Sequence, residues 1–137
     1  PDPPLVFHWS HAEVSTLETA YNSATARHPG KPWTAPQWFD FLKKVIREEP
    51  VVVRGALGFG LKAIAKSMHA HGLIETSWGD GPTDGLGAMV GAWTAAREAA
   101  ATGRKLSEMQ LVKEIEAYNE VDCKVMMEIV RYLRANH

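Results

Sequence analysis

The sequence predicts a single α/β domain, residues 1–137, in which helices dominate. Its length matches one domain, and its composition, 45% apolar and 23% charged, is that of a globular protein. Apolar residues recur at spacings of three and four in four or five segments, which predicts helices. Apolar runs typical of strands are short and few, so we expect only one or two strands.

The first 28 residues predict a strand followed by a helix. Leu5–Trp9 is a short run of apolar and aromatic residues and is interpreted as a strand. Ser10 and Glu13 then form a capping box, in which each side chain satisfies a backbone N–H at the start of a helix. The helix carries an apolar stripe and ends before His28. The stripe consists of Val14, Leu17, Tyr21 and Ala24.

The middle of the chain predicts one clear helix and one ambiguous segment. Residues 38–46 have helical apolar spacing, although their aromatic start could equally be a brief strand. The glycine-rich connection over 55–60 opens a helix predicted for 61–71, which Gly72 ends. Residues 76–85 carry glycine, proline and aspartate and predict a surface loop.

Two further helices are predicted in the last third of the chain. Residues 84–102 are small and helical in spacing, and Gly87 and Gly91 would permit close backbone approach. Ser107 and Gln110 suggest a second capping box, which would start a final helix that runs nearly to the end.

Composition excludes several classes of site and location. The sequence contains no run of 18 apolar residues, so we expect no membrane contact. Its start has neither a basic region nor an apolar core, which predicts an intracellular, cytoplasmic protein. The one cysteine, Cys123, excludes an internal disulfide and a cysteine-built zinc site. The first residue is Pro1 rather than Met, which suggests a piece of a longer protein.

One stretch of the chain is basic although the whole chain has a net charge of −1. Residues 43–66 hold six basic and two acidic side chains, a net of +4. Such a surface suits contact with a nucleic-acid backbone without base reading. Lys62, at the start of a helix, could meet a phosphate there, although a solvated lysine and simple surface alternation explain these charges as well.

Asp122 is the most informative anomaly. The apolar stripe of the final helix runs through Tyr118 and continues at Val125, and Asp122 occupies the position between them. A carboxylate in a core-facing stripe is costly unless it is paired, hydrogen-bonded or bound to a metal. The alternative is an aspartate at the margin of the stripe, bonded to a neighbouring backbone group or to an arginine.

Glu13 has two interpretations. Capping alone would explain it, but it also follows the carboxyl end of a strand, where α/β folds place functional groups. His8 and His11 flank this position, yet no second cluster completes a zinc site, so a histidine-based zinc site is disfavoured. His69 and His71 point in different directions on a helix and are expected at the surface.

Four segments resemble a known family. Tyr118-Asn119-Glu120-Val121-Asp122 resembles the third motif, Y-x-x-x-D, of DEDD-type 3′–5′ exonucleases, and Val6–Glu13 resembles the second motif, with Glu13 at its acidic position. Phe39-Asp40-Phe41-Leu42 and the segment from Gly60 to Ala65 resemble an Asp-Leu step and a Leu-Lys helix start. The likeness is greatest to the RecB-associated and YprB-like predicted nucleases. It covers about residues 5–133 and implies a ribonuclease H-like fold.

The resemblance implies a two-metal mechanism and the absence of one acidic motif of the family. In such nucleases two divalent ions about 4 Å apart hold the scissile phosphate, and oxygen-rich sites suit Mg²⁺ or Mn²⁺. Glu13 and Asp122 would be metal ligands, and Tyr118 would orient the attacking water. Asp40, Lys62 and His11 are possible accessory residues; for Asp40, local capping is the favoured interpretation. The family's first motif, Asp-x-Glu, does not occur in these residues, so we expect the C-terminal part of a partial ribonuclease H-like fold.

The implied function is a metal-dependent nuclease, or a fragment of one, that hydrolyses phosphodiester bonds. Its partners would be DNA or RNA, together with a missing N-terminal segment or a partner chain, and an unpaired strand edge could lead to self-association. The alternative is a non-catalytic helical module that retains part of the fold for interaction or nucleic-acid docking. The resemblance further predicts that the Leu5–Trp9 strand packs with the 107–134 helix, with Glu13 and Asp122 on the same side.

Overall fold

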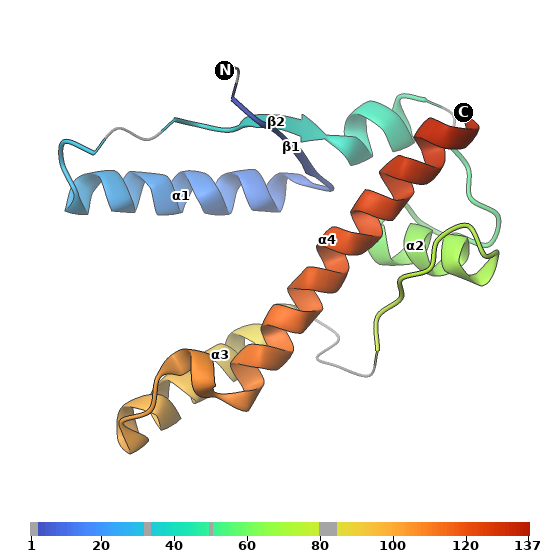
Figure 1. Ribbon diagram of the computed structural model, residues 1–137. Coiled ribbons are helices and arrows are strands. Elements are labelled where there is room, and N and C mark those ends of the chain that lie inside the picture. The colour runs from blue at the N-terminus through green and yellow to red at the C-terminus, as the bar shows by residue number, and fades with distance from the viewer. Residues whose placement is uncertain (1–2, 32–33, 50, 80–84) are drawn as a thin grey trace. The chain divides into compact units, whose positions relative to one another are not determined.

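The computed structural model describes residues 3–31, 34–49, 51–79 and 85–137 (Figure 1). The described residues form mostly helices, together with two strands that pair in a parallel sheet. The helix-dominated α/β class is therefore confirmed. The chain divides into two compact units, Pro1–Ile64 and Ala65–His137, and each is described by itself. A single domain over all 137 residues stays a prediction.

The first unit begins with a strand–helix–strand motif. Strand β1 (Leu5–His8) leads into helix α1 (His11–Arg27), and the chain returns as strand β2 (Gln37–Asp40). The strands pair in parallel, with Leu5 opposite Gln37 and His8 opposite Asp40. For residues 37–40 the brief strand, rather than the helix, is the correct alternative, because β-prone aromatic side chains can pair there with β1.

Helix α1 starts where the capping box predicts. Ser10 Oγ accepts a hydrogen bond from the Ala12 N–H at 3.5 Å and donates one to Glu13 Oε2 at 3.3 Å. However, α1 has no buried residue, and Leu17 and Tyr21 of its apolar stripe are 43% and 39% exposed. The helix therefore depends on its own backbone and cap more than on packing.

Aromatic side chains form the core of the first unit. The ring of Phe7 lies 5.1 Å from that of Phe39 and 6.2 Å from that of Phe41. Trp9 and Phe41 are 5% and 4% exposed, with ring centroids 5.8 Å apart. The Trp9 indole donates a 2.8 Å hydrogen bond to the Phe59 carbonyl, which ties the glycine-rich connection to this core.

The second unit includes most of helix α2 and two longer helices. Helix α2 (Leu61–Ala70) crosses the boundary between the units and is followed by Gly72, whose φ of 67° is left-handed. The Leu73 N–H then bonds the Met68 carbonyl at 2.9 Å, as in a glycine-terminated helix. Residues 76–79 of the predicted loop are neither helix nor strand, as predicted; residues 80–84 lie outside the described residues, and Gly85 is instead the first residue of helix α3.

Helices α3 (Gly85–Thr102) and α4 (Gln110–Asn136) pack against each other. Ala95, Ala99 and Met109 form a buried cluster there, with Leu111 and Val112 against it. A Cβ on Gly91 would lie 2.9 Å from Leu111 Cδ2, which confirms that Gly91 permits close approach.

The predicted capping box of Ser107 and Gln110 is wrong. Ser107 lies inside a single 3₁₀ turn, η2 (Leu106–Glu108), and Met109 is the residue that precedes α4. Met109 is 3% exposed, so burial of its side chain fixes the start of the helix and overrides the local serine signal. Glu108 instead accepts a 3.4 Å hydrogen bond from the Lys105 N–H.

Among the described residues, we find no helix with the length and apolar character needed to cross a membrane.

Candidate functional site

Asp122 lies half-buried in the middle of α4 and is held by a tryptophan. The Trp78 indole N–H donates a 2.7 Å hydrogen bond to Asp122 Oδ1. The stripe continues into the core as predicted, because Val125 and Ile129 have no exposed surface. The carboxylate is hydrogen-bonded, as a carboxylate in an apolar stripe requires, and its partner is an indole rather than the backbone group or arginine of the alternative interpretation.

Tyr118 lies one turn before Asp122 on α4 and is also half-buried. Residues four apart on a helix share a face, so the phenol and the carboxylate project from the same side. Tyr118 and Asp122 therefore lie on one face of α4, as their spacing predicts.

A second carboxylate of α4 holds the segment that carries Trp78. Glu128 accepts 2.9 Å hydrogen bonds from the N–H groups of Glu75 and Thr76, and a short one of 2.5 Å from Thr76 Oγ1. Burial alone would raise the pKa of Glu128. The hydrogen bonds from Thr76 and Glu75, with the positive charge of Lys124, outweigh burial and hold this pKa below its ordinary value.

Glu13 is exposed in the first turn of α1, just beyond the carboxyl end of β1. Its one described bond is the one from the Ser10 hydroxyl, so Glu13 contacts the residue that caps α1 but does not itself accept a backbone N–H as the predicted capping box requires. Glu13 belongs to the first unit, whereas Asp122 belongs to the second. The expected placement of the two carboxylates on one side therefore stays a prediction.

The carboxyl ends of β1 and β2 bring His8 and Asp40 into register. His8 is 5% exposed; its Nδ1 bonds the Ser10 carbonyl oxygen, and its ring meets that of Trp38 edge-on at 5.4 Å. His11, by contrast, is exposed on α1. These contacts make His8 part of the packed end of the sheet, as a donor to the backbone.

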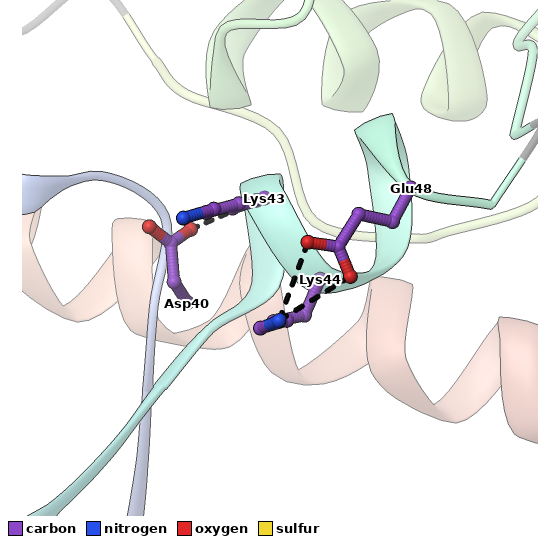
Figure 2. A network of polar contacts seen from close by, with 4 residues as sticks. All are labelled: Asp40, Lys43, Lys44 and Glu48. Atoms are coloured by element: carbon purple, nitrogen blue, oxygen red, sulfur yellow. Dashed lines mark hydrogen bonds and ion pairs between the residues drawn. The ribbon is translucent and has the colours of Figure 1, made fainter.

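Asp40 caps the short helix that follows it. Its Oδ1 accepts a 2.9 Å hydrogen bond from the Lys43 N–H, at the start of the π-helix η1 (Leu42–Arg47). Figure 2 shows this contact beside the ion pair one turn further on, where Lys44 Nζ lies 3.3 Å from Glu48 Oε1. Local capping, the favoured interpretation of Asp40, is therefore confirmed.

Some basic side chains of the stretch 43–66 contact other groups of the same stretch. Lys44 is paired with Glu48, and the Arg47 guanidinium lies 6.0 Å from the centre of the Phe59 ring. Lys62 is half-buried in the first turn of α2, and Lys66 is exposed. Contact of this stretch with phosphates stays a prediction.

The donor chemistry at Asp122 suits a hard cation, but a full set of ligands is not assembled. Its carboxylate is half-buried and one of its oxygens is anchored, as expected for an Mg²⁺ or Mn²⁺ ligand. Within the described ranges, no three His, Cys, Asp or Glu side chains are grouped closely enough to hold a metal ion. A hollow of about 470 Å³ beside α3, η2 and the start of α4 contains none of the predicted site residues.

Sequence reasoning missed Trp78 and Glu128. Trp78 could have been identified because it is a tryptophan in a polar loop, and a buried indole N–H needs a hydrogen-bond acceptor. Nothing in the sequence spacing identified its acceptor, which lies 44 residues further along the chain.

No family model matches this sequence, and neither the curated proteins nor the solved structures contain a significant match to it.

Proposed function

We propose that this chain belongs to a metal-dependent nuclease, 3′–5′ exonuclease-like and of the ribonuclease H-like group, and forms the C-terminal part of that domain. The observation that supports the proposal is Asp122, a carboxylate within the apolar stripe of α4, oriented by Trp78 and one turn after Tyr118. Asp122 breaks the apolar pattern of its helix, and breaks of a local pattern are typical of functional residues.

The proposed roles follow the chemistry of each side chain. Asp122 would hold a divalent cation, and the Tyr118 hydroxyl would orient a water molecule near it. Bound Mg²⁺ or Mn²⁺ would supply Lewis-acid activation of that water and stabilise the leaving oxygen. The Asp122 carboxylate would hold the cation, and its Oδ1 also accepts the Trp78 indole N–H.

The other predicted site residues belong to the first unit, and their roles stay proposals: Glu13 as an acidic ligand, and Asp40, Lys62 and His11 as accessory residues. The remaining carboxylates belong to a segment outside these 137 residues or to a partner chain, because no Asp-x-Glu occurs among them. The substrate is DNA or RNA, contacted through its backbone by the basic stretch 43–66.

Metal titration of the 137-residue protein tests the proposal. We expect weak Mn²⁺ binding by calorimetry, and we expect Asp122→Asn to abolish it. This substitution keeps an Oδ1 acceptor for the Trp78 indole, so the α4 contact survives while the charge is removed. Glu116→Gln, on an exposed position of the same helix, is the matched control and should leave binding unchanged. Equal Mn²⁺ binding by the Asp122→Asn protein would refute this ligand.

The second candidate is a non-catalytic helical module for interaction or nucleic-acid docking. It is favoured by the fact that hydrogen bonds within the chain already account for Glu13, Asp40 and Asp122. This candidate predicts that an oligonucleotide binds equally well with Mg²⁺ and with a chelator, and that Asp122→Asn does not change its affinity. Fluorescence anisotropy with single- and double-stranded probes distinguishes the two candidates.

A further inference from the structure

The glycine-rich connection between η1 and α2 presents an aromatic ring to solvent. Phe59 is 50% exposed, and the Arg47 guanidinium lies 6.0 Å from the centre of its ring. A Cβ added to Gly58 or to Gly60 would find no atom within 4 Å, so the space beside Phe59 along the chain is open. Part of the ring is therefore available to a ligand, and a cation already lies beside it.

The backbone that carries this ring is fixed to the aromatic core of the first unit. The indole of Trp9, which is buried, donates its 2.8 Å hydrogen bond to the carbonyl oxygen of Phe59 itself. A buried indole N–H needs an acceptor, so loss of this bond would leave a donor unsatisfied. The core therefore sets the position of Phe59, although half of its side chain faces solvent.

The charges on this part of the first unit are mostly positive. Residues 43–62 hold five basic and two acidic side chains, a net of +3, and one of the acids, Glu48, is paired with Lys44. Lys43 and Arg47 are both exposed and lie about one turn apart on η1. A phosphodiester strand that lay along η1 and the ring would thus meet positive charge, as binding to a nucleic-acid backbone requires.

The same connection also exposes aliphatic side chains. The Ala56 N–H bonds the Val53 carbonyl at 3.0 Å, which closes a tight turn, and Val52 and Leu57 on either side of that turn are almost fully exposed. These two side chains alone would suit an acyl chain or an apolar protein surface as well. The ring with its guanidinium favours a nucleic acid, because a base can stack on an aromatic face beside a cation, whereas an acyl chain gains nothing from that charge.

We propose that Phe59 is a stacking platform for one unpaired base of a single-stranded nucleic acid, and that Arg47 contacts the phosphate next to that base. A duplex cannot use the platform, because its bases are already stacked within the double helix. The inference deepens the proposed contact of the stretch 43–66 with nucleic acid and rests on it, but it requires no metal ion and no cleavage.

Fluorescence anisotropy in the presence of a chelator tests the platform without metal chemistry. The probes are a single-stranded DNA, an RNA of the same sequence and the matching DNA duplex. Phe59→Leu keeps an apolar side chain and removes the ring, and it should weaken the binding of both single strands about 5–150-fold while duplex binding stays unchanged. Phe59→Tyr keeps a ring and should retain the affinity of the unmodified protein.

Tyr21→Leu is the matched control, because Tyr21 is a partly exposed aromatic residue of the same unit on α1, outside the basic stretch. This substitution should leave all three affinities unchanged. Arg47→Gln should instead weaken single strands and duplex alike, and it should lower the slope of log affinity against log salt by about one.

A second measurement on the unmodified chain covers the case in which Phe59→Leu does not fold. In a sample with ¹³C-labelled phenylalanine, saturation with the single-stranded DNA should move the ring resonances of Phe59 upfield, because a stacked base shields them. The duplex should not produce this shift.

The outcomes separate the inference from the function on which it rests. Unchanged single-strand affinity in folded Phe59→Leu, or Phe59 resonances that do not move at saturation, would overturn the platform alone. Absence of binding to every probe would overturn the proposed contact with nucleic acid, and with it this inference. Co-sedimentation with phosphatidylserine vesicles that is lost in Leu57→Ser, in a protein that binds no probe, would assign the connection to an anionic lipid surface instead.

Discussion

Glu128 is the best-anchored carboxylate among the described side chains of α4. It accepts hydrogen bonds from two backbone N–H groups and the Thr76 hydroxyl, and these bonds hold its pKa below its ordinary value. Its ionised form is therefore favoured in the folded state over the unfolded state. The attachment stabilises the second unit whenever Glu128 is charged.

We expect Glu128→Gln to lower the free energy of unfolding by about 1–2 kcal/mol at pH 7, because the amide is neutral and has one acceptor oxygen where the carboxylate uses two. The stabilisation by Glu128 is fully present above the unfolded pKa of glutamate, about 4.3, and is lost as the pH falls through the lower folded pKa. The variant should therefore lose less stability than the unmodified protein between pH 5 and pH 3, as measured by urea denaturation.

The control for this prediction is Glu120→Gln on the same helix. Glu120 Oε1 lies 3.7 Å from Lys124 Nζ in an exposed i, i+4 ion pair, and such pairs contribute at most about 0.5 kcal/mol to stability. If Glu120→Gln lost as much stability as Glu128→Gln, the hydrogen bonds from Glu75 and Thr76 to Glu128 would not be the cause of the stabilisation.

At the scale of elements, most helices could be predicted because their signals are local. Ser10 caps α1 and Gly72 ends α2, both as predicted, since each needs only a few neighbouring residues. The strand at Trp38 was ambiguous, because its pairing partner, β1, lies in another part of the sequence. The predicted start of α4 was wrong, because burial of the Met109 side chain outweighs the local capping signal of Ser107.

Because α3 and α4 approach closely at Gly91, we predict that only a small side chain fits at position 91. Gly91→Val should destabilise the protein by about 1–3 kcal/mol, because its side chain would be forced against Leu111, which already lies 2.9 Å from the position of a Cβ. Ala92→Val, at the exposed neighbouring position, should cost only the helix-propensity difference, about 0.5 kcal/mol.

Thermal unfolding of both proteins measures the difference. In the double variant Gly91→Val/Leu111→Ala, removal of the leucine side chain should recover part of the loss at Gly91. Strictly additive effects of the two substitutions would show that Leu111 is not what limits the size of residue 91.

At the scale of the whole molecule, the candidate site could be predicted only in part. Asp122 was identifiable because a carboxylate interrupts an apolar stripe, and Glu13 because it follows a strand. Whether the two carboxylates act together depends on how two compact units are arranged, which no local pattern of spacing encodes. The partner of Asp122 likewise depends on tertiary packing across 44 residues.

We predict that Glu13 and Asp122 contribute equally to the rate of cleavage, although Glu13 is exposed and Asp122 is half-buried. We expect the 137-residue protein to show little nuclease turnover, because two acidic positions are fewer than two clustered metal ions need. In the protein extended by the adjoining upstream coding sequence, Glu13→Gln and Asp122→Asn should each lower the cleavage rate about 10²–10³-fold. The α1 cap is the bond from the Ala12 N–H to Ser10 Oγ, and Glu13→Gln keeps an acceptor for the Ser10 hydroxyl, so a loss of rate would not reflect loss of that cap.

The central claim, that Asp122 and Tyr118 belong to a metal-dependent nuclease site, is tested most directly by an exonuclease assay on that extended protein. Single- and double-stranded substrates are incubated with Mg²⁺, with Mn²⁺ or with a chelator. We predict cleavage that requires the metal and is largely lost in Asp122→Asn and in Tyr118→Phe. Robust cleavage that persists in both variants, or an extended protein that is folded and inactive with either metal, would contradict the claim.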